Sequence, residues 1–403
     1  MTDAGRGAPH RRAPTPSVIV GLALVAIAIG VGGGSILAAA KGSAATPRPS
    51  GTSVAIGPGS LPTAGLPTPP PSLNPTPEPT PEPTPVLVAA PLTGLPVSQP
   101  STLQHPIAVM IDDQKDARPQ AGFNAADVVW QAPAEGGIPR YMLIFQSRLP
   151  TSIGPIRSAR QYYIEWAAEW RAIYAHIGGS GQAQATLRAR GHGQLVFNAD
   201  GFRFDGSDMY RVATRPAPHN LYSDARHLRS MEAAIGAKDG PVTPVWSFGA
   251  PLVADARPVG TTIAIHYPYE TITYRYDPLT NTYLRYIDRA KTPQVDAADG
   301  KVVAPANVVI LRMRFGPLND GHPEKKRLEA SDVGSGEAII SSNGRVILGK
   351  WMKASVMAPT LLFDASGAPV TLNAGQTFVQ VIPLGYPYEV HRGSVPGTRV
   401  RYS

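Results

Sequence analysis

The chain of 403 residues contains no cysteine. This absence excludes disulfide bonds, thiolate metal sites and thiol nucleophiles, and it also excludes a lipid attached to an N-terminal cysteine. Charged residues are scarce as well: they make up 16% of the chain, whereas an average soluble chain has about 25%. Proline and glycine are abundant instead, with 43 and 40 residues. This balance predicts a disordered segment followed by a globular part with many turns.

A long uncharged run lies close to the N-terminus. Residues 17–40 contain no charged side chain, and the basic residues 1–16 precede them. A helix needs about 20 apolar residues to cross a bilayer, and a basic flank stays on the cytoplasmic side. We therefore predict a cytoplasmic tail, a single-pass transmembrane anchor and an extracytoplasmic remainder in the cell envelope. A cleaved signal peptide is the alternative, although its apolar part spans only about 7–15 residues.

Residues 41–91 are rich in proline, with 15 prolines among the 45 residues of 47–91. Such a segment cannot bury enough apolar surface to fold, and it adopts extended polyproline II. We expect a disordered linker that holds the rest of the chain away from the membrane. The net charge of the chain is +8. Beyond the linker no basic run is interleaved with aromatic residues, so nucleic acid is not an expected partner.

The remaining residues divide into two parts with different sequence patterns. In residues 92–244 short apolar runs alternate with helical patterns, which predicts an α/β domain. The expected strands are 107–111, 127–130, 141–145 and 172–177, and the expected helices are 158–171, 182–190 and 223–235. In residues 245–403 alternating strand patterns follow one another between turns, and Asn343-Gly344 is a strong hairpin signal. This second pattern predicts a β-rich domain, either a sandwich or a barrel.

Several motifs in one order resemble a known family. They include ARPQAGFNAADVVWQ at 117–131, EGGIPRY at 135–141, IGPIRSAR at 153–160, HIGGSGQA at 176–183, APHNLY at 217–222 and VGSGEAIISSNGRVILGKWMK at 333–353. They are similar to the YerB-like family of bacterial envelope proteins, which has N- and C-terminal domains of unknown function. The resemblance implies an envelope location and a two-part architecture, but it does not indicate any particular activity. Members are commonly lipoproteins, and the chain departs from them because it lacks cysteine.

Carboxylates that follow a strand are the first candidates for chemistry. Asp112 and Asp113 follow the apolar run 107–111, and ligands of open α/β sheets bind where strands end. Either could act in acid–base catalysis or hold a divalent cation, and either could instead be a turn or cap residue. Because side chains alternate along a strand, we expect only one of them to face a site. Glu135, in a loop with two glycines, is a further acid candidate.

Four arginines are candidates for binding an anion. Arg157 and Arg160 lie three residues apart at an expected helix start, so they should share a helix face. A helix N-terminus adds free N–H groups and a partial positive charge, and arginine binds phosphate or carboxylate through two nitrogens. Arg118 and Arg140 lie in other motif loops and could join them. The alternative is that these arginines form ion pairs with acids of the protein, such as Glu135.

The glycine-rich turn 178–181 could also approach an anion, because it joins a strand to a helix. Gly179 and Ser180 are its candidate ligand-binding residues. His176, at the end of the preceding strand, could be a base or a metal ligand, or simply a core histidine. His219 and Asn220 follow two prolines in a stiff loop that could position functional groups. The spacing of these residues matches no known metal motif.

Three functions remain open. The chain could bind an anionic cell-wall or envelope ligand through its arginines and the glycine turn. It could instead be an enzyme, a hydrolase or transferase on wall glycan or phosphodiester. Asp112 or Glu135, together with His176 and His219, would then do the acid–base work. It could also be a non-catalytic scaffold for envelope proteins. The sequence specifies no metal and no cofactor.

Overall fold

The computed structural model describes residues 86–189 and 194–396. The expected cytoplasmic tail and transmembrane anchor lie outside these ranges, as does most of the linker. Among the residues that the model describes, no helix has both the length and the apolar character needed to cross a membrane.

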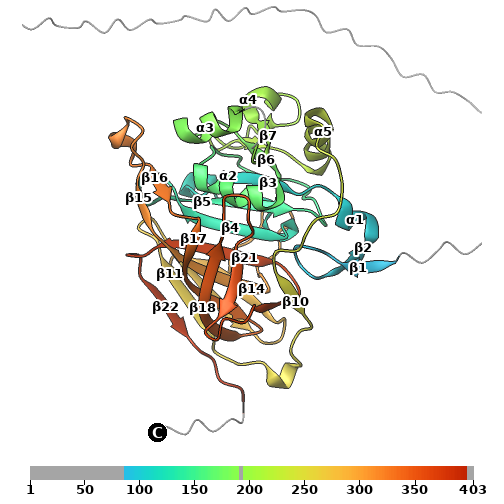
Figure 1. Ribbon diagram of the computed structural model, residues 1–403, viewed down its shortest axis with the longest axis vertical. Helices are drawn as coiled ribbons and strands as arrows, with labels where there is room; N and C mark the ends of the chain where they lie inside the picture. The colour runs from blue at the N-terminus through green and yellow to red at the C-terminus, as the bar shows by residue number, and fades with distance from the viewer. Residues whose placement is uncertain (1–85, 190–193, 397–403) are drawn as a thin grey trace, which may run out of the picture. The chain divides into compact units, whose positions relative to one another are not determined.

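One mixed sheet of ten strands dominates the fold (Figure 1). In spatial order its strands are β19 (Leu361–Asp364), β18 (Arg345–Lys353), β17 (Gly334–Ser342), β14 (Asn307–Met313), β21 (Thr377–Pro383), β4 (Val128–Pro133), β5 (Pro139–Phe145), β3 (Ile107–Asp112), β6 (Ile173–His176) and β7 (Phe197–Asp200). Strand β21 pairs in parallel with β4. The strands of the two expected domains therefore join in one sheet.

This sheet corrects the expectation of a separate C-terminal sandwich or barrel. Half of its strands come from beyond residue 245, and they extend the N-terminal sheet rather than closing on themselves. The reason lies in β4 and β21, which are largely apolar and are buried along nearly their whole length. Strands buried in this way need neighbours on both edges to satisfy their backbone groups.

A second, antiparallel sheet packs on one face of the large sheet. Its strands are, in spatial order, β13 (Thr282–Ile287), β12 (Thr271–Asp277), β11 (Thr262–His266) and β22 (Tyr388–His391). Burial alternates along β11 and β12, as expected for a sheet with one covered face. Its buried residues share a core with β3 and β14, for example Ile265 with Val109 and Ile310.

The helices cover both faces of the large sheet. They are α1 (Gln99–Leu103), α2 (Gln161–Ala167), α3 (Gly181–Arg188), α4 (Gly201–Phe204) and α5 (Ala225–Ile235). Helices α2 and α3 pack on the face opposite the second sheet, and α5 packs on the same face as it. Helix α5 matches its expected extent, with Asp224 as N-cap and Gly236 in the left-handed conformation at its end.

Helix α2 begins later than the sequence predicts. Arg160 is its N-cap residue and has extended backbone angles, with φ −132° and ψ 151°. The segment before it is tied to the glycine turn, because Ala159 N donates a hydrogen bond to Gly178 O at 3.0 Å. Arg157 and Arg160 therefore precede the helix, and the expectation that they share one of its faces is wrong.

Short strand pairs and one tight hairpin complete the fold. The pairs are β1 (Leu87–Ala89) with β2 (Pro96–Ser98), β8 (Tyr210–Arg211) with β9 (Leu221–Tyr222), β10 (Ser247–Gly249) with β20 (Thr371–Asn373), and β15 (Phe315–Pro317) with β16 (Leu328–Ala330). Strands β17 and β18 are joined by Asn343 and Gly344, at φ 52° and 71°. Both residues are left-handed, as a two-residue hairpin turn requires, so this prediction is confirmed.

The directions of the strands define two opposite sides of the large sheet, one at each end of the strands. Strands β3 and β4 are both antiparallel to β5, and β21 is parallel to β4 and to β14. These four strands therefore run the same way. Their carboxyl ends meet at one edge of the sheet, which we call the carboxyl edge, and their starts meet at the opposite, amino edge.

Candidate functional site

A cavity of about 290 Å³ opens at the carboxyl edge of the sheet. It is lined by Asp112, Gln114, Glu135, Ile138, Arg140, Arg157 and Lys325. We call it the Asp112 cavity. These residues come from the end of β3, the loop between β4 and β5, the start of β5, the segment before α2, and the loop between β15 and β16. Four of the predicted site residues thus line one cavity.

Asp112 forms one wall of the cavity and is only 2% exposed. Its Oδ2 lies 2.8 Å from Nδ1 of His219 and 3.0 Å from Nε of Arg157. The contact with Arg157 is an ion pair whose atoms are not aligned for a hydrogen bond. The second oxygen, Oδ1, accepts a hydrogen bond from the backbone N–H of Gln114 at 3.1 Å. The stiff loop that carries His219 therefore docks on the end of β3.

Glu135 holds two other arginines. It forms ion pairs with Arg160 and with Arg140, the latter at 3.0 Å between Oε2 and Nη2. Arg140 also donates from Nη1 to the carbonyl oxygen of Ser158 at 2.6 Å. Burial lowers the pKa of Arg140, and it lowers the pKa of Arg160 to about 10. Both guanidiniums stay charged near neutral pH, so the Glu135 carboxylate compensates a buried positive charge.

Two cations of the cavity keep donor atoms free. The terminal nitrogens of Arg157 make no hydrogen bond with any residue that the structure describes, and its side chain is 18% exposed. Lys325 is exposed, and its ammonium makes no ion pair within the described ranges. The cavity lining therefore carries three cations and two carboxylates, and one cation more than it can neutralise.

Asp113 points to the opposite face of the sheet, as strand alternation requires. It accepts hydrogen bonds from Arg118 Nη2 at 2.9 Å and from Gln131 Nε2 at 2.7 Å. Arg118 also pairs with Glu270, which lies in the turn between β11 and β12 of the second sheet. Burial raises the pKa of Asp113 to about 6, although the Arg118 charge opposes this shift. This network joins the two sheets, so the structure places Arg118 away from the cavity.

The other predicted residues of the first half have local partners. The ring nitrogens of buried His176 lie 2.8 Å from Gly178 O and 2.9 Å from Asn198 Oδ1. Ser180 is the N-cap of α3, because its Oγ accepts a hydrogen bond from Ala183 N at 3.3 Å. The glycine turn therefore serves as a helix cap, and neither it nor His176 lines the Asp112 cavity.

Gly179 and Asn220 also lie outside the cavity lining. Gly179 forms a backbone bridge with Ala159. Asn220 accepts a hydrogen bond at Oδ1 from Arg211 Nη1 at 3.0 Å. The structure thus unites Asp112, Glu135, Arg140 and Arg157 at the cavity and separates these two residues from them.

Sequence reasoning missed Lys325, which lies far along the chain from the other lining residues. The hairpin of β15 and β16 brings it to the cavity, and Gly136 N donates to Lys326 O at 3.3 Å to fix this approach. Its sequence signal is a charged cluster, EKKR at 324–327, that follows a glycine- and proline-rich turn. No group of three or more histidine, aspartate or glutamate side chains within the described ranges is arranged to hold a metal ion.

The fold and the cavity define a two-part protein whose α/β and β-rich segments share one sheet. Residues 92–238 match the N-terminal domain of a protein family of unknown function, DUF3048, and residues 263–379 match its C-terminal domain. The chain belongs to this family, the YerB-like proteins.

Two comparisons with a protein of Bacillus subtilis support this assignment. The chain is 29% identical over 300 residues to YerB of strain 168, whose name describes it as a candidate lipoprotein. The match covers 73% of this chain and 86% of that protein. The crystal structure of the YerB protein from Bacillus subtilis matches with a TM-score of 0.66 and 26% identity, covering 75% of this chain and 99% of the solved one.

Proposed function

We propose that the protein is an extracytoplasmic envelope protein, tethered to the membrane by residues 17–40, that binds an anionic ligand of the cell wall or envelope in the Asp112 cavity. The name of the Bacillus relative supports an envelope location. No cysteine occurs in the 403 residues, so the uncharged apolar run 17–40 would do the tethering that a lipid does in lipoproteins.

One observation carries the binding proposal: Arg157 and Lys325 both line the cavity with donor atoms that no described residue uses. Arg157 is held in place by Asp112, so its free nitrogens face a ligand without first losing much conformational freedom. Guanidinium and ammonium groups of this kind bind phosphate and carboxylate by charge-assisted hydrogen bonds. The small volume of the cavity suits a single anionic group with a short attachment.

Ligand binding by the full chain tests this proposal. We would purify it in detergent micelles and titrate it with N-acetylmuramate and glucose 6-phosphate by calorimetry. Lys325→Glu should weaken binding by about ten-fold, because it reverses a charge at the cavity. Lys326→Glu is the matched control, since this neighbouring exposed lysine does not line the cavity. Equal binding by both variants would place the anion site elsewhere.

The contact between Asp112 and His219 supports a second candidate function. A carboxylate that holds Nδ1 of a histidine at 2.8 Å orients the ring for acid–base work at its other nitrogen. Glu135 lines the same cavity, so a hydrolase or transferase acting on wall glycan or phosphodiester would have two carboxylates there. Release of product from a wall fragment by the wild type, lost in Asp112→Asn, would favour this reading over binding alone.

A further inference from the structure

A larger pocket, of about 550 Å³, lies at the amino edge of the large sheet. We call it the amino-edge pocket. Its lining comes from the residues that precede β4, β14 and β21, from the end of β5, from the turn between β12 and β13, and from the segment 251–257. It is thus built by both halves of the chain, at the edge opposite the Asp112 cavity.

The charges of the amino-edge pocket are unbalanced. Three cations, Arg148, Arg257 and Lys301, line it together with a single carboxylate, Asp299. None of the four forms an ion pair within the ranges that the structure describes. Asp299 is instead held by Asn124, whose Nδ2 donates to it at 3.0 Å, and by the backbone N–H of Lys301 at 2.9 Å. The pocket therefore presents an excess of positive charge to solvent.

Arg257 is fixed in place without neutralising its charge. Its Nε donates to Leu252 O at 2.8 Å and its Nη1 donates to Pro278 O at 2.7 Å. Carbonyl oxygens orient a guanidinium and leave it cationic, and the second terminal nitrogen makes no hydrogen bond with the described residues. An arginine held in this way is pre-organised to bind an anion.

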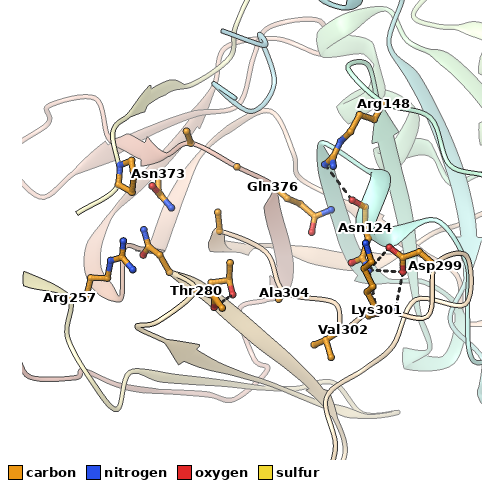
Figure 2. Close-up of a pocket in the computed structure, with 16 residues that line it drawn as sticks. Asn124, Arg148, Arg257, Thr280, Asp299, Lys301, Val302, Ala304, Asn373 and Gln376 are labelled. Atoms are coloured by element: carbon orange, nitrogen blue, oxygen red, sulfur yellow. Dashed lines mark hydrogen bonds between the residues drawn. The ribbon is translucent and has the colours of Figure 1, made fainter. Parts of the chain in front are cut away.

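Asn373 lies on the same side of the pocket as Arg257, whereas Arg148, Lys301 and Asp299 lie on the other side (Figure 2). It is 4% exposed, and its Oδ1 is buried without a hydrogen-bond partner. Its backbone is held by Asn307, which both donates to Asn373 O and accepts from Asn373 N. A buried acceptor without a partner calls for a donor from outside the chain, and a ligand hydroxyl would supply one.

We propose that the amino-edge pocket binds a hydroxyl-bearing anion, a sugar or polyol that carries a phosphate or carboxylate group. The anionic group would bind Arg257, and a hydroxyl of the same molecule would donate to Asn373. Further amide and hydroxyl groups, from Gln376 and Thr282, also line the pocket. No aromatic ring is among the described lining residues, so the pocket offers no stacking platform for a base or a neutral sugar.

Calorimetric titration of the full chain in detergent micelles tests this site. The probes are glucose 6-phosphate, glucuronate, glucose and inorganic phosphate. We expect glucose 6-phosphate or glucuronate to bind. Preference for the first indicates a phosphate ligand, and preference for the second indicates a carboxylate ligand. Glucose and inorganic phosphate should bind about ten-fold more weakly, since each satisfies only one half of the pocket. Inorganic phosphate that binds as tightly as glucose 6-phosphate would overturn the role of the hydroxyl group.

Variants assign the binding to this pocket. Arg257→Met should weaken binding by about ten-fold, whereas Arg289→Met, an exposed arginine outside the pocket, should leave it unchanged. Lys301→Gln changes an exposed side chain that the fold does not use, and it should weaken binding by about three-fold. If neither Arg257→Met nor Lys301→Gln weakens binding, the proposal is wrong.

The variants also keep this site separate from the Asp112 cavity. The inference does not rest on the proposed function, because the two pockets lie at opposite edges of the sheet. Binding that is lost in Arg257→Met and kept in Lys325→Glu supports the amino-edge pocket alone. Binding that is lost only in Lys325→Glu supports the Asp112 cavity and overturns the amino-edge pocket.

Discussion

The two edges of the large sheet gather positive side chains in opposite ways. At the carboxyl edge, Arg140, Arg157 and Arg160 each contact a carboxylate. At the amino edge, Arg148 and Arg257 have no acidic partner among the described residues, and backbone carbonyls alone hold Arg257. Arginine is thus neutralised by carboxylates at one edge, whereas at the other edge its charge has no acidic partner among the described residues.

Burial explains this difference. Arg140 and Arg160 are buried at the carboxyl edge, where an unpaired guanidinium would lose its hydration without compensation. Arg148 is exposed, so water and salt already screen its charge. The comparison teaches that a cluster of arginines at a strand end is weak evidence for an anion site until their partners are known. A cation without a carboxylate partner, such as Lys325, is stronger evidence for an anion site than an arginine that is already paired.

The largest effect is expected for Arg160→Ala at the carboxyl edge. This change removes a buried cation, so the Glu135 carboxylate keeps only Arg140 as a partner. We expect the free energy of unfolding to fall by about 3 kcal/mol, as for other broken buried ion pairs. Urea unfolding followed by tryptophan fluorescence measures it. A loss smaller than about 1 kcal/mol would mean that the pair does not hold the fold, and the contrast between the edges would fail.

A buried acid that has no arginine partner gives a complementary test of how burial acts on charge. Asp332 follows β16, and burial together with the Glu165 carboxyl raises its pKa to about 8. The folded protein therefore keeps a proton that the unfolded chain releases above about pH 4. The resulting stability is complete below that pH and is lost as the pH rises to about 8.

Asp332→Asn removes this dependence on pH. The wild type should lose roughly 1–2 kcal/mol of unfolding free energy from this group between pH 6.5 and pH 8, and the variant should lose less by that amount over the same range. Urea titrations of both proteins at pH 5, 6.5 and 8 give the two slopes, in which the other acids cancel. Identical slopes would show that Asp332 is not protonated in the folded protein.

The smallest effect is expected for Arg148→Ala at the amino edge. The Arg148 side chain is exposed, and the one hydrogen bond that it makes with the described residues is to Asn124 O at 3.4 Å. We expect the free energy of unfolding to change by less than about 0.5 kcal/mol. The same urea titration used for Arg160→Ala makes the two arginines directly comparable. A loss as large as that of Arg160→Ala would erase the distinction between the two edges.

Much of the local structure could be predicted from the sequence. The apolar run 107–111 is the buried strand β3, and Asp112 at its end lines a cavity while Asp113 faces away. The Asn343-Gly344 turn forms the expected hairpin. These predictions succeed because strand alternation and turn conformation depend on residues that are close in the chain.

The candidate site was predicted less completely. Sequence reasoning proposes Ser180 as an anion ligand, and the structure places it as the N-cap of α3, because a serine before a helix can satisfy a free N–H of the first turn. It proposes Arg118 for a binding site, and the structure pairs Arg118 with Glu270, which lies just before β12. Nothing local in the sequence indicates that the loop carrying Lys325 reaches the cavity, nor that the residues of the amino-edge pocket meet.

The sequence by itself therefore determined the positions of several core strands, the side chains that follow them, and the absence of thiol chemistry. Only the tertiary structure decided that β21 pairs with β4, so that both halves of the chain share one sheet. It also decided which cations meet carboxylates and which stay free. The physical reason is that hydrophobic periodicity acts over a few residues, whereas strand pairing and ion pairing depend on which distant groups are buried side by side.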